Sequence, residues 1–509
     1  MASSVFSFGI LGIDGYLVEV ETETIIGVNS VSIVGLGDKA VKEARERLEA
    51  AIVQSNFRFP FQKVVFNLAP SDMKKTGTHY DLAMAVGLLI RTGQIKPVIN
   101  LRETGFIGEL SLNGNIRPVS GILPMVLKAK EMGIKQIILA KENVREAMLV
   151  SNIEIYGCQT LTEVVDVVSG SVSSSKAPVI TPEKKSKPLL DFSDIKGHGL
   201  LIEYIKIAAA GGHNLLMVGP LGCGKSMIAK RIPSILPDMC ESESLEVTKI
   251  YSVANLLQEK GTLVKKRPFR APHHNASTNA LVGGGGFPKP GEISLAHNGV
   301  LFLDEISEFR KSTLDALRQP LEDGEVTITR VWGSNTYPAK FMLIGAMNPC
   351  PCGYFGQEKC RCTDYEIIKY RQRLSGPILD RLDIQKYVEP VDFFKKDQTS
   401  QSSEDIRESV TIARTIQKER YKNIPLISCN SQLTPNLVDK FCELDKECIS
   451  LLRKAYERFQ LSGRSIHKFI KVARTVADLE GEQNINIHHM RKSILSRDLE
   501  KDNTIFIGE

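Results

Sequence analysis

The chain has 509 residues, of which 42% are apolar and 24% charged, so it is long enough for two to four domains and has the composition of a folded globular protein. Its 65 basic and 59 acidic residues leave a net charge of +6, which permits nucleic-acid binding through local basic segments but does not indicate it. No apolar run is long enough to span a membrane and no basic residue precedes the first apolar stretch, so we expect a cytoplasmic protein with no membrane partner.

Residues 1–168 have the pattern of one α/β domain. Short apolar runs at 64–68 and 136–140 predict strands. Between them, residues 38–53 predict a helix, because four apolar side chains recur on one face: Val41, Ala44, Leu48 and Ile52. Residues 169–190 are rich in Ser, Pro and Lys, a composition that buries little surface, so we expect an interdomain linker.

Residues 191–393 alternate between strand and helix patterns, which predicts a parallel sheet covered on both faces. Residues 394–509 begin with a polar segment and then have helical patterns. The clearest is 465–479, where six apolar residues recur at helical spacing: Ile466, Phe469, Ile470, Ala473, Val476 and Ala477. We therefore expect an α/β protein with a helical C-terminal domain.

A phosphate-binding loop is predicted at 219–226, where GPLGCGKS fits G-x-x-x-x-G-K-[ST]. A strand pattern precedes it and a helix pattern follows, which argues against a chance glycine turn. Lys225 is expected to pair with the β- and γ-phosphates of ATP and Ser226 to bind Mg²⁺. The remaining nucleotide contacts are expected from the backbone of the loop and the start of the helix: Gly219, Gly222, Cys223, Gly224 and Met227.

Two further strands end in polar side chains that suit the same site. The run 299–303 ends in Asp304, which can reach Mg²⁺, and Glu305, which can polarise the water that attacks the γ-phosphate. The run 340–347 ends in Asn348, whose amide can orient that water. Such residues are often simple turn formers, but the phosphate loop upstream favours a catalytic function for them.

Ten cysteines in a long cytosolic chain do not suggest a disulfide framework. Four of them cluster as two C-x-C pairs separated by seven residues: Cys350, Cys352, Cys360 and Cys362. Four thiolates on a short glycine-bearing loop suit tetrahedral Zn²⁺, and we predict a structural zinc site. The alternative is reduced free thiols or a redox pair.

Several long motifs resemble the magnesium-chelatase-like AAA+ proteins, and more narrowly the ComM/YifB group. They are the stretch that begins RPFRAPHHNAS at residue 267, the glycine run at 283–286, the segment KPGEISLAHNGVLFLDE, and the sequences NPCPCG and LSGPILDRLD. The resemblance covers nearly the whole chain. It implies a P-loop AAA+ core with a helical lid, in a homohexameric DNA helicase that drives branch migration during recombination and natural transformation.

The resemblance also implies catalytic arginines. Arg381 matches the family's arginine finger, which a neighbouring subunit supplies, and Arg464 matches the sensor-2 arginine. A fixed guanidinium can stabilise the charge that develops on a transferred phosphoryl group.

Two segments of this family branch project into the ring pore, so the resemblance places single-stranded or branched DNA beside them. The first is an insert within 271–292 that carries Lys289, and the second is a hairpin within 326–340 that carries Arg330, Trp332 and Lys340. Basic groups pair with phosphates and an aromatic ring can stack on a base. Packing of the hairpin against the ring is the alternative for each residue. We expect His273, His274 and His297, in the loop motifs nearby, to be structural.

The N-terminal domain resembles the Lon-protease-like domain, a ribosomal-S5-type α/β fold. A Lon-type site needs a Ser nucleophile and a Lys base. His79 falls where the Ser is expected and Met125 where the Lys is expected, so we predict a catalytically degenerate domain, although Ser71 and Thr78 lie close to the aligned position.

Three other functions compete with the DNA motor. A magnesium-chelatase-type subunit that remodels a partner protein shares the AAA+ core but, as far as the resemblance goes, lacks the Lon-like domain. An ATP-driven protease is disfavoured by His79 and Met125. A non-enzymatic assembly platform would have a damaged nucleotide site, whereas every expected position matches here.

Overall fold

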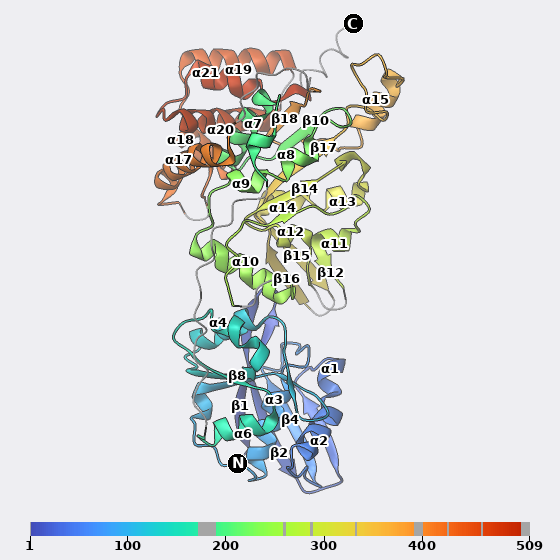
Figure 1. The fold of residues 1–509 in the computed structure, drawn as a ribbon, viewed down its shortest axis with the longest axis vertical. Helices are drawn as coiled ribbons and strands as arrows, with labels where there is room; N and C mark the ends of the chain where they lie inside the picture. The colour runs from blue at the N-terminus through green and yellow to red at the C-terminus, as the bar shows by residue number, and fades with distance from the viewer. Residues whose placement is uncertain are drawn as a thin grey trace.

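The computed structural model describes residues 2–171, 190–257, 261–285, 289–330, 333–390, 401–424, 427–459 and 462–499. The molecule is elongated, with the N-terminal domain at one end and the central and C-terminal domains at the other (Figure 1). Within these described ranges, no helix is both long and apolar enough to cross a membrane.

The N-terminal domain is built on a seven-stranded mixed sheet. Its strand order is β3 (Ser30–Val34), β4 (Lys63–Ala69), β2 (Asp14–Ile25), β1 (Ser3–Leu11), β5 (Thr104–Ile107), β8 (Gln136–Ala140) and β9 (Glu154–Cys158). Helix α3 (Asp81–Arg91) covers one face and α4 (Ile122–Glu131) the other, so the sheet has a separate apolar core on each side. The strands expected at 64–68 and 136–140 are confirmed as parts of β4 and β8.

The helix expected at 38–53 is two consecutive helices. Asp38 caps α1 (Lys39–Lys42), and α2 (Ala44–Gln54) follows after Glu43. All four predicted apolar residues are buried in the core, so the predicted face is confirmed even though one residue interrupts the helix.

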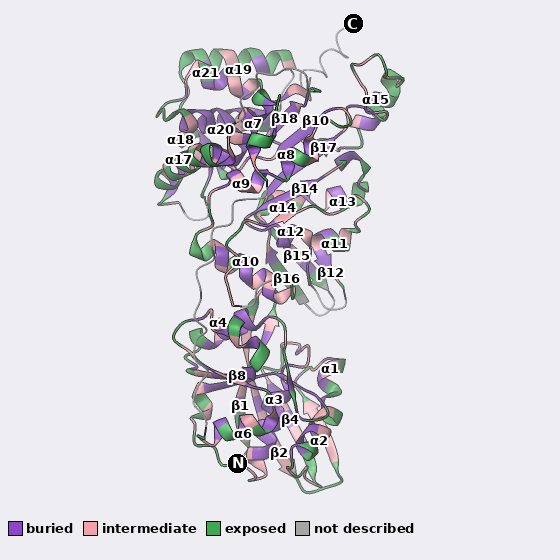
Figure 2. Cartoon of the chain, viewed as in Figure 1, coloured by how far each residue is buried: buried purple, intermediate pink, exposed green. Residues whose placement is uncertain are grey.

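The central domain contains a five-stranded, all-parallel sheet. Its order is β11 (Phe269–Arg270), β14 (Val300–Leu303), β17 (Met342–Met347), β10 (Leu215–Val218) and β18 (Ile384–Tyr387). Side chains alternate between two cores: Leu215 and Met217 face one and Leu216 and Val218 the other, so both faces are covered, as Figure 2 shows by the buried colour of these strands.

The C-terminal domain is helical, as predicted. Its helices are α17 (Ser403–Tyr421), α18 (Pro435–Phe441), α19 (Lys446–Phe459), α20 (Gly463–Glu480) and α21 (Ile487–Ile494), which enclose a core of their own. Helices α17 and α20 pack against α7 (Gly199–Gly211) of the central domain, beside the central sheet (Figure 1).

The N-terminal domain contacts the central domain through α10 (Glu241–Val253). The buried carboxylate of Glu146 accepts hydrogen bonds from the backbone N–H of Leu123, at 3.0 Å, and from Ser252 Oγ on α10, at 2.5 Å. Lys249 of α10 pairs with Asp14 at 3.2 Å. The β1–β2 turn also approaches the central domain, where Ile13 packs against its core.

The two segments expected near DNA lie together in the central domain. The insert contains α11 (Thr278–Val282), β12 (Gly283–Gly284) and β13 (Lys289–Pro290), and the hairpin consists of β15 (Glu325–Arg330) and β16 (Gly333–Pro338). A Cβ atom at Gly283 would lie 2.9 Å from the Ile328 side chain, so insert and hairpin are in contact.

Candidate nucleotide site

The phosphate loop follows an interior strand of the parallel sheet. It follows β10, which pairs with β17 on one side and β18 on the other. Gly222 and Gly224 adopt φ values of 77° and 85°, a conformation that favours glycine, and Gly224 precedes α8 (Lys225–Ala229). The ammonium group of Lys225 donates to the carbonyls of Gly219 at 2.6 Å and Pro220 at 2.9 Å, so it lies over the loop.

The two predicted Mg²⁺ ligands are in direct contact. Ser226 Oγ donates to Asp304 Oδ2 at 2.6 Å, although the two residues are 78 positions apart. A hydroxyl and a carboxylate that converge at a helix N-terminus beside a phosphate loop form an oxygen ligand set of the kind Mg²⁺ prefers with ATP. The residues present therefore fit ATP with Mg²⁺.

Asn348 also lies close to Lys225. It follows β17, which is adjacent to both β14 and β10, and its Oδ1 is 3.5 Å from Lys225 Nζ. Because parallel strands end at the same edge of the sheet, Asp304, Glu305 and Asn348 gather around the phosphate loop. The arrangement predicted from three separate sequence motifs is thus a single site.

Glu305 has an unusual backbone and a partner that the sequence did not indicate. Its φ of 48° places a non-glycine residue in the left-handed region. His274 Nδ1 lies 3.3 Å from Glu305 Oε2. We expected His274 to be structural; its contact is instead with the candidate catalytic carboxylate. The only available signal was its place in the loop after β11, the strand beside β14.

The two predicted catalytic arginines do not meet the phosphate loop of their own chain. Arg381 pairs with Glu322 of α14 (Arg318–Asp323) and donates to the carbonyls of Pro377 at 2.8 Å and Arg318 at 3.2 Å. Arg464 is exposed near the N-terminus of α20. Among the described residues, neither arginine forms a hydrogen bond or ion pair with Lys225, Ser226, Asp304 or Glu305, so each would have to move or serve another subunit.

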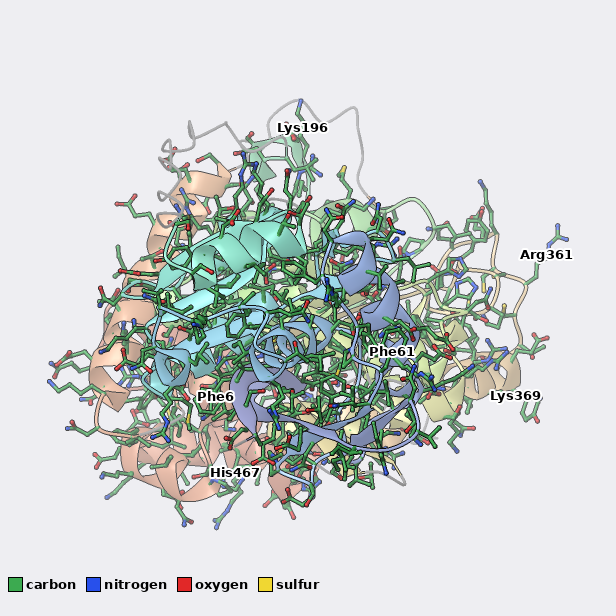
Figure 3. The ribbon with its side chains drawn as sticks, turned by 90° about the horizontal axis from the view of Figure 1, so that it is seen from below. Phe6, Phe61, Lys196, Arg361, Lys369 and His467 are labelled. Carbon is green, nitrogen blue, oxygen red and sulfur yellow. The ribbon has the colours of Figure 1, made fainter. Side chains whose placement is uncertain are left out.

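The four predicted zinc ligands come together in the loop between β17 and α15 (Asp364–Arg371). All four sulfur atoms lie within 4.8 Å of one another, and all four cysteines are free thiols. Backbone N–H groups of Arg361 and Tyr354 lower the pKa of the Cys352 thiol to about 6. Arg361 itself is exposed and extends outward at the edge of the molecule (Figure 3).

The four candidate DNA-contacting residues are described to different extents. Lys289 is exposed on β13, beside the hairpin. Lys340 is exposed at the base of the hairpin, where its side chain lies over Gly324. The backbone of Arg330 pairs with Gly333 in β15–β16, but its side chain and the whole of Trp332 lie outside the described residues.

His297 is structural, as expected. The ring is buried, its Nε2 lies 3.0 Å from Glu246 Oε2, and its Nδ1 accepts the backbone N–H of Lys340 at 3.1 Å. His273 is exposed and packs against the ring of His274.

The Lon-like positions of the N-terminal domain are buried rather than open to substrate. Met125 lies on α4 in the core, and His79 is buried with no hydrogen-bond partner for Nε2. Burial lowers the pKa of His79 to about 4, so the ring is neutral near pH 7. Neither side chain supplies the nucleophile or the amine base of a Lon-type protease.

Comparison with protein families gives three matches along the chain. Residues 18–143 match a family described as "Subunit ChlI of Mg-chelatase", residues 191–395 match "Magnesium chelatase, subunit ChlI", and residues 400–497 match "Magnesium chelatase, subunit ChlI C-terminal". The central match covers the phosphate loop, the Asp304 strand and the four-cysteine loop.

Relatives also match from end to end. The chain is 40% identical to the "Competence protein ComM" of Haemophilus influenzae over 499 residues, which is 96% of each protein. It is 37% identical to YifB of Escherichia coli over 502 residues, which is 98% of this chain and 97% of YifB. A Lon protease of Herpetosiphon aurantiacus is 27% identical over 199 residues, 36% of this chain and 24% of that protein.

Proposed function

The chain belongs to the ComM/YifB group of magnesium-chelatase-like AAA+ ATPases, and from this membership we propose that it is a homohexameric, ATP-driven DNA helicase acting in the cytoplasm. Its proposed action is branch migration of recombination intermediates during homologous recombination and natural transformation. Single-stranded and branched DNA are the proposed partners.

The observation that supports a motor is the complete nucleotide site. Lys225 contacts the phosphate loop and Asn348, Ser226 contacts Asp304, and Glu305 follows at the end of the same strand. ATP and Mg²⁺ are its proposed cofactors. In this site Lys225 would neutralise phosphate charge, Ser226 and Asp304 would hold the metal, and Glu305 would polarise the attacking water. A structural zinc ion is a separate proposal that concerns the four-cysteine loop.

DNA as substrate is supported by the insert and the hairpin. Gly283 of the insert adjoins Ile328 of the hairpin, so the two segments lie side by side. Lys289 is exposed on β13, and Arg330 belongs to β15. Basic residues on the insert and the hairpin can pair with successive phosphates of a DNA strand.

The subunit arrangement follows from the arginines. Arg381 is engaged with Glu322 of its own chain and not with its own phosphate loop. In a closed ring each Arg381 would reach the nucleotide of the next subunit and stabilise its developing charge.

The proposal is tested by measuring ATP hydrolysis with no DNA, with linear duplex and with forked or four-way DNA, using Glu305→Gln as the control. Stimulation by branched DNA in the wild type, and loss of hydrolysis in the variant, would support a DNA motor. Robust hydrolysis that no DNA changes would reject DNA as substrate. That result would favour the alternative, a magnesium-chelatase-type ATPase that remodels a partner protein.

A further inference from the structure

The sulfur atoms of the four-cysteine loop have the spacing of ligands around a single metal ion. Cys350 Sγ lies 3.4 Å from Cys352 Sγ and 3.9 Å from Cys360 Sγ, and Cys352 Sγ lies 3.7 Å from Cys360 Sγ. A tetrahedral zinc site with Zn–S bonds of about 2.3 Å has sulfur atoms about 3.8 Å apart. A disulfide would need about 2.05 Å. The spacing therefore fits one tetrahedral ion and not a disulfide.

Backbone N–H groups donate hydrogen bonds to three of the sulfur atoms, an arrangement that suits negatively charged thiolates. Cys352 accepts N–H groups from Tyr354 and Arg361, Cys360 accepts the N–H of Cys362, and Cys362 accepts the N–H of Cys352. Such outer contacts orient metal ligands and disperse their negative charge. Zinc binding would release the thiol protons to solvent, with no change of oxidation state.

The loop also contacts the nucleotide site at two points. Gly353, at φ 82°, packs against Leu221 of the phosphate loop: a Cβ atom at Gly353 would lie 3.0 Å from Leu221 Cγ. Two residues before Cys350, Asn348 reaches Lys225 at 3.5 Å. Cys350 itself is completely buried. The four-cysteine loop therefore packs against the phosphate loop through Gly353, and it directly follows Asn348 in the chain.

Turns, rather than a helix or strand, shape the loop: the N–H groups of Gly353, Gln357 and Cys360 donate to carbonyls three residues before them. From residue 349 to residue 363 there is no helix or strand, and α15 begins only at Asp364, capped by Thr363. Arg371 of α15 lies over the Phe355 ring at 5.1 Å and reaches the Pro349 carbonyl at 3.5 Å. A metal bound by all four thiolates would add cross-links that these turns do not supply.

We propose that Cys350, Cys352, Cys360 and Cys362 bind one Zn²⁺ and that this ion holds the loop against Leu221 and Asn348, so that nucleotide affinity depends on zinc. This inference rests on the proposed ATP site but not on DNA as the substrate. The ion is structural, because all four of its ligand positions are taken by protein sulfurs and none remains for a reacting group.

The test measures zinc by mass spectrometry and nucleotide affinity with a fluorescent ADP analogue, both on the full chain without DNA. We expect about one zinc per wild-type chain. Cys360→Ser is expected to lose the zinc and to bind nucleotide at least ~10-fold more weakly. Cys240→Ser is the matched control: Cys240 is an exposed thiol outside the loop, and its substitution is expected to leave both values unchanged.

A second variant separates zinc binding from the contact between the loop and the nucleotide site. It also provides a test if Cys360→Ser fails to fold. Leu221→Ala keeps all four thiols but removes the contact with Gly353, so it is expected to retain about one zinc and still bind nucleotide several-fold more weakly. Wild-type protein with less than ~0.1 zinc per chain, or with iron in its place, would overturn the metal assignment. Wild-type nucleotide affinity in Leu221→Ala, or in a folded, zinc-free Cys360→Ser, would overturn the coupling.

Discussion

At the scale of single residues, the site combines ordinary ligands with one less expected contact. The Ser226–Asp304 hydrogen bond at 2.6 Å and the Lys225–Asn348 approach at 3.5 Å join side chains from three neighbouring strand ends. The contact of His274 with Glu305 adds a group from the loop after the edge strand. Since Glu305 is half-exposed and its backbone is in the left-handed region, we expect His274 to orient the carboxylate.

Replacement of His274 by alanine tests this positioning. Because Glu305 acts on the attacking water and not on ATP binding, we expect His274→Ala to lower kcat roughly 10- to 100-fold while KM for ATP stays within about twofold. Steady-state hydrolysis at saturating and limiting ATP provides both values. The adjacent His273→Ala, at an exposed position with no contact to Glu305, is the control and is expected to resemble the wild type. An unchanged kcat in His274→Ala would contradict the positioning role.

His79 makes the N-terminal domain sensitive to acid. Burial lowers its pKa from 6.5 to about 4, so the unfolded chain binds a proton in this interval that the folded chain does not. The contribution of His79 to stability is therefore complete above pH 6.5 and decreases by up to about 3 kcal/mol as the pH falls towards 4. We expect His79→Leu to lose less protection between pH 7 and 4.5, measured by hydrogen exchange in the adjacent helix α3. The same pH dependence in both proteins would refute the assignment.

At the scale of helices and strands, the sequence predicted the parts that depend on local pattern. The apolar runs before Gly219, Asp304 and Asn348 are buried strands of one sheet, and the amphipathic run at 465–479 lies within α20. The sequence predicts one continuous helix at 38–53, whereas the structure has two helices separated by Glu43. The break leaves no signal in the sequence because the apolar face continues across it.

Contacts between segments far apart in the chain could not be predicted from the sequence. His274 meets Glu305 only because β11 pairs with β14, and a two-residue strand has no readable pattern. The contact of Gly353 with Leu221 joins two loops 132 residues apart, counted as 353 minus 221. The packing of the N-terminal domain on α10 includes a buried carboxylate, Glu146, which resembles any surface glutamate in the sequence.

The hairpin formed by β15 and β16 supports a prediction about DNA. Arg330→Glu and Lys340→Glu would each replace the proposed attraction to phosphate with a repulsion, so we expect weaker DNA binding and a salt dependence reduced by about one ion per substitution. Fluorescence anisotropy of a labelled forked DNA over a salt series measures both effects. Basal ATP hydrolysis reports that the nucleotide site is intact. Unchanged affinity in both variants would exclude the hairpin as a DNA contact.

At the scale of the whole molecule, the N-terminal domain lies against the same side of the central domain as the hairpin. Ile13 of the β1–β2 turn packs into the core that contains Val326 and Ile328 of β15, and Lys249 of α10 pairs with Asp14 (Figure 1). A ring of these chains would therefore place its N-terminal domains beside the proposed DNA path. Movement of the hairpin would displace the β1–β2 turn, because Ile13 packs against the hairpin's core.

The proposed ring predicts complementation between two inactive subunits. A Lys225→Ala subunit has no working phosphate loop but keeps Arg381. An Arg381→Ala subunit keeps the phosphate loop but lacks the arginine. In an equal, randomly assembled mixture about a quarter of the sites combine an intact loop with an intact neighbouring arginine. We expect hydrolysis to recover to about that fraction of the wild-type rate after mixing. No recovery in mixtures that assemble would contradict a shared site.

The most direct test of the central claim follows a labelled four-way DNA junction during incubation with the full-length protein and ATP. The account predicts that wild-type protein resolves the junction into two forked duplexes, that this requires ATP and Mg²⁺, and that Glu305→Gln binds the junction but leaves it intact. A junction that remains intact with wild-type protein, while ATP is hydrolysed at the same rate with and without DNA, would contradict the claim that this ATPase is a branch-migration motor.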